Sequence, residues 1–210
     1  GDNTVLLQLV AKGVLSDFRQ AFYEDGQLAT LRFIGRRINT VLTEQNPFVI
    51  RNTDEVHLRS PEFHASAFSF REKRLLASLA QRLRGHIKDG KSAYEASLIC
   101  QTHMLSLAEA YVERLVLSVA HERLAAAPPE LRPILQKLIA LYALSTIEQH
   151  KGWYLEQDYL AGSKSKAIRR SIDGLCADLR PEAVGLVDAW GIPEQLLGAP
   201  IARKEEGSEV

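Results

Sequence analysis

One long stretch, residues 92–127, constrains the fold of this sequence more than any other, and it ends at a pair of prolines, Pro128 and Pro129. Apolar residues recur along it every seven positions, and two more fill the alternate positions of the same repeat: Leu98, Leu105, Val112 and Val119, with Ala108 and Leu115. Such spacing is typical of a helix packed along a seam of a bundle. We therefore expect one helix here, with the repeating residues facing inward.

The remaining sequence is also helical in pattern. One-sided apolar spacing starts at Thr4 and closes at Gly26, and it predicts an amphipathic first helix. Similar patterns predict four further helices, over residues 66–88, 130–150, 164–179 and 181–190. Residues 30–42 fit a basic helix or a short extended segment, residues 43–65 read as a linker between two packed units, and residues 152–162 as a short link. The predicted class is all-α, an antiparallel helical bundle.

Composition excludes several classes of function. The chain has 210 residues, with 26 Lys and Arg against 26 Asp and Glu, so its formal net charge is zero. This balance argues against a nucleic-acid binder or a binder of anionic membranes. No apolar run approaches the roughly 20 residues that a membrane span needs. The two cysteines, Cys100 and Cys176, are too few for a disulfide framework, and we expect both to be free, buried thiols in a reducing compartment.

Motifs for metal or nucleophilic chemistry are incomplete in this sequence. A di-iron bundle needs a Glu three positions before a His, and none of the six histidines has one. Cys100 and His103 share a helical face, but two ligands do not make a metal site. Ser163 and Lys166 have the Ser-x-x-Lys spacing of some acylating enzymes without their companion motifs. We therefore predict no metal site and no self-contained active site.

Three stretches of the sequence resemble FAD-dependent acyl-CoA oxidases. Residues 1–18, GDNTVLLQLVAKGVLSDF, resemble the segment that follows the catalytic glutamate of that family. Residues 60–76, SPEFHASAFSFREKRLL, and 179–198, LRPEAVGLVDAWGIPEQLLG, resemble its C-terminal helical domain. The resemblance favours a bacterial-type oxidase over an acyl-CoA dehydrogenase, because the dehydrogenases are shorter and have no equivalent second helical domain.

The resemblance implies an activity and a place for this chain within it. The parent enzyme would oxidise fatty acyl-CoA to trans-2-enoyl-CoA with FAD and pass the electrons to O2, giving peroxide, in fatty-acid β-oxidation. Its catalytic base would be a Glu directly before Gly1, so we expect no catalytic residue within this chain and no activity of the isolated piece. Gly1, Asn3 and Thr4 are the expected cofactor contacts, although Asp2, Asn3 and Thr4 could equally be helix caps.

The resemblance also implies a domain organisation. Residues 1–42 would end a first helical domain, 43–65 would be the linker, 66–199 a second helical bundle, and 200–210 a flexible tail. We expect a homodimer in which this chain supports dimerisation and closes the cofactor site. Phe70, Trp153 and Trp190 are candidate core or interface aromatics.

Two questions of function stay open at this stage. A dehydrogenase-like protein with an electron-transfer partner and a non-catalytic helical interaction module are the alternatives to an oxidase. The terminal residues, EEGSEV, are not the peroxisomal Ser-Lys-Leu signal, and we expect a cytoplasmic protein.

Overall fold

The computed structural model describes residues 3–24, 50–193 and 196, and every regular element within them is helical. The predicted all-α class is therefore confirmed. The elements are α1 Asn3–Glu24, α4 Glu55–Leu58, α5 Pro61–Lys88, α6 Ala93–Ile99, α7 Gln101–Ala126, α8 Arg132–Gln149, α9 Lys151–Glu156, α10 Gly162–Leu179, the 3-10 turn η1 Arg180–Glu182, and α11 Ala183–Asp188. The expectation for residues 30–42 lies outside the described residues.

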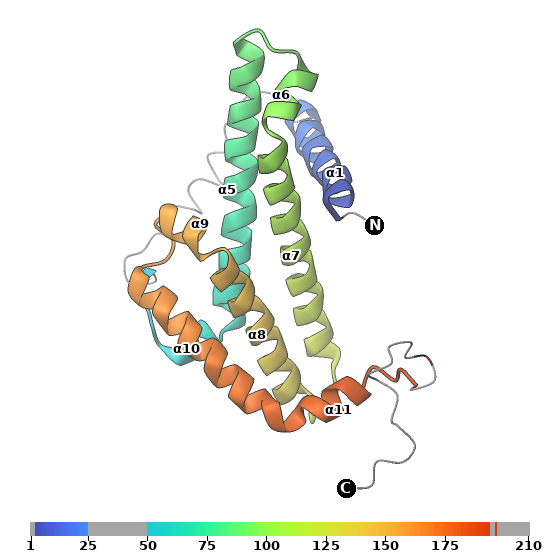
Figure 1. The fold of residues 1–210 in the computed structure, drawn as a ribbon, viewed down its shortest axis with the longest axis vertical. Helices are drawn as coiled ribbons and strands as arrows, with labels where there is room; N and C mark the ends of the chain where they lie inside the picture. The colour runs from blue at the N-terminus through green and yellow to red at the C-terminus, as the bar shows by residue number, and fades with distance from the viewer. Residues whose placement is uncertain (1–2, 25–49, 194–195, 197–210) are drawn as a thin grey trace, which may run out of the picture.

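Two long antiparallel helices, α5 and α7, form the spine of the bundle (Figure 1). At one end α8 packs against both helices of this pair, and α10 packs against α8. At the other end α1 lies along α7, and the short α6 leans over the end of the pair (Figure 1). The arrangement leaves α7 at the centre, since it contacts α1, α5 and α8.

The first spine helix begins earlier than the predicted Ser66. Its N-cap is Ser60, whose Oγ accepts a hydrogen bond from the backbone N–H of Phe63 at 3.2 Å. Pro61 occupies the first helical turn, where a missing N–H costs nothing. Phe63 and His64, assigned to the linker, are buried helical residues. The linker prediction is therefore wrong from Pro61 onward.

The predicted single helix over residues 92–127 is two helices. Ser92 and Glu95 form a capping box that starts α6, and the chain turns at Cys100 before α7 begins. The turn lets α6 fold back onto α5, and it buries both Ala96 and Cys100 completely. Burial of this corner explains why the helix does not continue straight, although the residues around it are good helix formers.

The predicted seam of α7 lies mostly on the outside. Val112, Leu115 and Val119 are 36–45% exposed, and Leu98 of α6 is 51% exposed. The buried residues of α7 are Leu107, Ala108, Ala110 and Leu117, so only Ala108 of the predicted heptad set is fully inside. The helix is apolar around much of its circumference, and the seven-residue spacing cannot tell which apolar face meets this bundle.

Residues 152–162, which the sequence predicted to be a short link, pack against α5 through aromatic side chains. Residues 151–156 form α9, and both Tyr154 and Tyr159 are buried. Tyr159 stacks on Phe70 with ring centroids 4.3 Å apart, while the Tyr154 hydroxyl donates to the backbone carbonyl of Ala67 at 3.0 Å. The expectation of a core role is confirmed for Phe70. Trp190 is 79% exposed, so the core alternative is wrong for it and the interface alternative stays a prediction.

Candidate functional site

The predicted cofactor residues lie at the leading end of α1. Gly1 is outside the described residues, and Asn3 and Thr4 form the first turn of α1 with exposed side chains. This turn carries no acidic residue, so its backbone N–H groups offer a favourable environment for an anion. Contact of Asn3 or Thr4 with a flavin stays a prediction.

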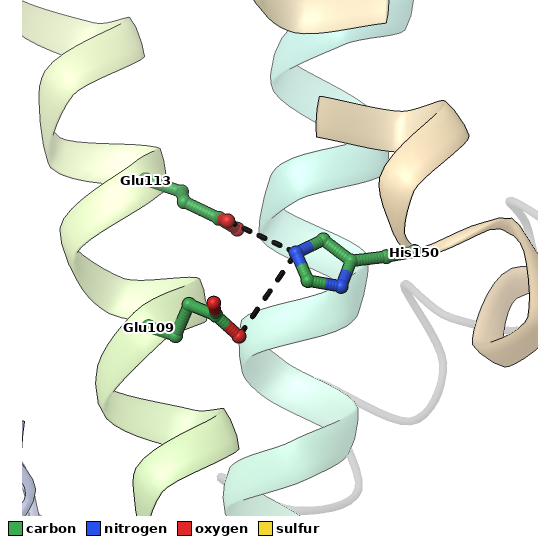
Figure 2. Close-up of side chains that lie close together, drawn as sticks. All are labelled: Glu109, Glu113 and His150. Carbon is green, nitrogen blue, oxygen red and sulfur yellow. Dashed lines mark hydrogen bonds and ion pairs between the residues drawn. The ribbon is translucent and has the colours of Figure 1, made fainter. Parts of the chain in front are cut away.

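A second polar group lies inside the bundle, where α7 and the end of α8 face each other. Glu109 and Glu113 stand one turn apart on α7 and point toward His150 (Figure 2). His150 Nε2 lies 3.0 Å from Glu113 Oε1 and 4.0 Å from Glu109 Oε2. One ligand atom from each residue falls within 4.8 Å of the others, which by spacing alone resembles a metal triad.

A buried guanidinium already neutralises the negative charge that would attract a metal ion to these carboxylates. The Arg71 side chain on α5 is only 5% exposed. Its Nη2 donates to Glu109 Oε2 at 3.2 Å and its Nη1 donates to Glu113 Oε2. A metal ion at the triad would sit beside this cation at low local dielectric, where repulsion is strong. We therefore interpret Arg71, Glu109, Glu113 and His150 as an ion network, defined here as the Arg71 network.

The Arg71 network ties three helices together. Arg71 comes from α5, both glutamates come from α7, and His150 follows α8 directly. The Tyr142 hydroxyl of α8 adds a hydrogen bond of 3.2 Å to the backbone carbonyl of Glu113. A buried charge is tolerated only when it is paired and hydrogen-bonded. The network therefore fixes how these helices sit against one another.

A buried lysine forms the third polar group. Lys164 on α10 is fully buried, with its Nζ 3.9 Å from the centre of the Phe63 ring and 3.1 Å from His57 Nε2. Burial lowers the pKa of Lys164 to about 8. It also lowers the pKa of His57, and the positive charge of Lys164 adds to that effect. The buried lysine is therefore not the one in the Ser-x-x-Lys spacing, because Lys166 is exposed.

The two cysteines differ in exposure. Cys100 is fully buried, as expected, but Cys176 is exposed, so that half of the prediction is wrong. His103, which shares a face with Cys100, turns instead to α5. Its Nε2 lies 3.1 Å from both the Leu75 carbonyl and the Ser78 hydroxyl. The pair therefore carries no catalytic arrangement.

An apolar surface accompanies these polar groups. We define the α7 stripe as the exposed residues Val112, Leu115, Val116 and Val119, which are spaced along one helical face. The outer face of α1 adds Val5, Leu6 and Leu9, each more than half exposed. Clustered apolar residues of this kind mark an interaction surface. Within the described residues, no helix is both long and apolar enough to cross a membrane.

The comparison with solved structures shows which fold the chain has. The chain superimposes on an acyl-CoA oxidase from tomato with a TM-score of 0.77 at 23% identity, covering 97% of this chain and 30% of that one. Acyl-CoA oxidase 1 from Yarrowia lipolytica gives a TM-score of 0.67 at 26% identity, covering 71% of this chain and 22% of that one. The bundle therefore has the fold of one part of these larger oxidases.

Sequence comparison then gives the family. The family model described as acyl-CoA oxidase matches residues 60–205. The peroxisomal acyl-coenzyme A oxidase 2 of Arabidopsis thaliana is 36% identical over 98% of this chain, and the mouse acyl-coenzyme A oxidase-like protein is 29% identical over 95%. The chain belongs to the acyl-CoA oxidase family, as its resemblance predicted. It spans about a third of these relatives, 30% and 31% of their lengths.

The Arg71 network was missed at the sequence level. Members that are hydrogen-bonded to each other lie up to 42 positions apart in the sequence, so no local motif contains them. The only available signal was the pair of glutamates four residues apart on a helix. That pair alone is far more often a solvated surface pair.

Proposed function

We propose that this chain is the C-terminal helical part of an FAD-dependent acyl-CoA oxidase. The whole enzyme would oxidise a fatty acyl-CoA to the trans-2-enoyl-CoA: the α-proton goes to a carboxylate base and the β-hydride to FAD. When bound, FAD supplies the hydride acceptor and transfers two electrons to O2, giving peroxide. The observation that carries the proposal is the family match over residues 60–205.

The contribution of this chain would be positional. We assign residues 1–42 to the end of the first helical domain, 43–60 to the linker and 61–199 to the second bundle, which starts with α5, and 200–210 to the tail. The base would be a Glu directly before Gly1. The exposed first turn of α1, free of acidic side chains, supports a phosphate or flavin contact near Asn3 and Thr4.

The apolar surfaces support the assembly part of the proposal. The α7 stripe and the outer face of α1 are exposed here, and they would be covered by the rest of the enzyme or by a second subunit in a homodimer. The Arg71 network would keep α5 and α7 in register, so that these surfaces have a fixed shape.

The type of oxidase and its location are also part of the proposal. The sequence resemblance favoured a bacterial-type, cytoplasmic enzyme. The relatives named above are eukaryotic, and the Arabidopsis protein is named as peroxisomal. A dehydrogenase that uses an electron-transfer partner is the alternative, and the electron acceptor distinguishes the two.

The test uses the full-length protein that contains this chain. Without oxygen, fatty acyl-CoA should bleach the flavin absorbance; in an oxidase, admitting air should restore that absorbance and release one peroxide per enoyl-CoA formed. Changing the Glu before Gly1 to Gln should leave FAD bound and abolish turnover, because α-proton removal needs the carboxylate. Turnover that requires an artificial electron acceptor would favour the dehydrogenase. Retained turnover in the Gln variant would contradict the assignment of the base.

A further inference from the structure

A cavity of about 370 Å³ opens at the end of the bundle that is remote from α1. Its lining residues come from the start of α5, the last turns of α7, the first half of α8 and the last turns of α10. The volume falls within the range of pockets that hold small organic ligands, roughly 300–1,000 Å³. The function proposed above assigns no role to this cavity.

The floor of the cavity is apolar. Residues from four segments contribute carbon surface: Pro61, Leu124, Pro133, Ile139, Ala140 and Leu175. Ala140 and Leu175 are buried parts of the main core, so the floor is rigid. A rigid apolar concavity favours an apolar ligand body, since filling it removes carbon surface from water on both sides.

The polar part of the lining is cationic or neutral. Arg59 and Lys137 line the cavity together with Gln136, His64 and His121, and no acidic residue is among the lining residues that the structure describes. His64 Nε2 lies 2.8 Å from the Leu58 carbonyl, which can only accept, so that nitrogen carries the hydrogen. Burial lowers the pKa of His64 to about 4, so the ring is neutral at pH 7.

The two cations share one weak counter-charge. Arg59 Nη1 and Lys137 Nζ lie 3.5 Å and 3.6 Å from the same oxygen of Asp178. Arg59 has a second, closer partner in Glu55 at 2.6 Å. Lys137 has only the longer contact to Asp178 among the ion pairs of the described residues. The Lys137 side chain is 42% exposed and has fewer acidic partners than Arg59, so it is the lining cation best placed to receive an anion.

We propose that this cavity binds an amphipathic anion, with an apolar tail on the floor of Leu124, Ile139 and Leu175 and a single carboxylate at Lys137. The lining residues supply both halves of this chemistry, and they come from helices whose positions the core fixes. The site is separate from the first turn of α1 and from the α7 stripe. It would let a small free carboxylate bind to this domain without entering a catalytic site.

The experiment compares two ligands of equal tail length and opposite charge. Isothermal titration of the full 210-residue chain with octanoate and with octyltrimethylammonium should show binding of octanoate only. Lys137→Met should weaken octanoate binding about fivefold, as expected for one partly exposed ion pair. The matched control Lys166→Met removes an exposed lysine that does not line the cavity, and it should leave binding unchanged.

A cavity-filling variant separates this site from the apolar surface elsewhere. Leu124→Trp should abolish octanoate binding while the α7 stripe stays intact, and Gln136→Trp on α8 serves the same purpose if the first variant does not fold. Circular dichroism confirms the helical content of each. Equal binding of the two ligands, or octanoate binding that survives a folded filling variant, would overturn the proposal.

Discussion

Arg71 of α5 and Glu113 of α7 form a largely buried ion pair, with side chains 5% and 16% exposed. Glu109 and His150 complete the network around them. The Arg71 guanidinium neutralises the half-buried Glu113 and also pairs with Glu109, whose side chain is 40% exposed. The loss of one member is therefore more damaging than the loss of a surface pair.

The first prediction concerns this pair. Arg71→Met should lower the free energy of unfolding by about 3–5 kcal/mol, because two glutamates would remain near the core without their cation. Urea denaturation followed by circular dichroism measures the change. Arg74→Met on the same helix is the control: Arg74 is exposed and its Nε donates to Gln157 Oε1 at 3.2 Å, so a change within about 0.5 kcal/mol is expected. Equal effects of the two variants would contradict a stabilising role for the network.

Lys164 gives the chain a distinctive response to alkaline pH. Its pKa falls from an ordinary 10.5 to about 8 on burial, so between these values the unfolded chain binds more protons than the folded chain. The free energy of unfolding should therefore rise across this range. Lys164→Met removes the titration, so wild type should gain stability relative to this variant between pH 7.5 and 9.5. Paired urea denaturations measure the gain, and Lys166→Met should show no such trend.

His64 should affect the stability of the chain at acidic pH. Burial lowers its pKa from 6.5 to about 4, so its contribution to stability is complete above pH 6.5 and is lost as the pH falls toward 4. His64→Gln cannot titrate, and it should lose less stability than wild type between pH 7 and 4.5. In NMR spectra the His64 ring signals should stay those of the neutral imidazole above pH 5. A midpoint near 6.5 would refute the effect of burial.

The α7 stripe makes a prediction about association. Val116 is 47% exposed, so Val116→Asp should reduce self-association of the 210-residue chain at little cost in stability. Light scattering and urea denaturation measure the two effects. The adjacent Leu117 is 2% exposed, and Leu117→Ala should cost about 2–5 kcal/mol of stability without improving solubility. In the full-length enzyme, Val116→Asp should instead destabilise the assembly, and an unchanged full-length protein would argue that the stripe is not an interface.

The sequence predicted the helical class and most of the helices because apolar spacing is a local property. It also contained the true start of α5, since Ser60 followed by Pro61 is a recognised start signal that the proline-based linker assignment overrode. The turn at Cys100 carried no comparable signal, because neither proline nor glycine marks it. Such a turn depends on packing against α5, which sequence spacing does not report.

Burial direction and the Arg71 network could not be read from the sequence for a related reason. Val112 and Val119 fit a heptad repeat, but Leu107 and Leu117 are the residues that are buried. Only the positions of α1, α5 and α8 decide which face of α7 is buried. Arg71 precedes α7 in the chain and His150 follows it, and the role of each depends on its contacts with the two glutamates of α7.

The way α1 is attached has a mechanical consequence. Among the α1 side chains that the structure describes, Ala11 is fully buried, and Val14 and Leu15 pack against the cluster that holds Leu79 of α5 and Leu107 of α7, so α1 is held to the bundle beyond its first two turns. The first turn of α1 therefore extends beyond the part of the helix that contacts the bundle (Figure 1). The side chains of residues 3–6 are exposed, so a group held at this turn takes its orientation from the bundle.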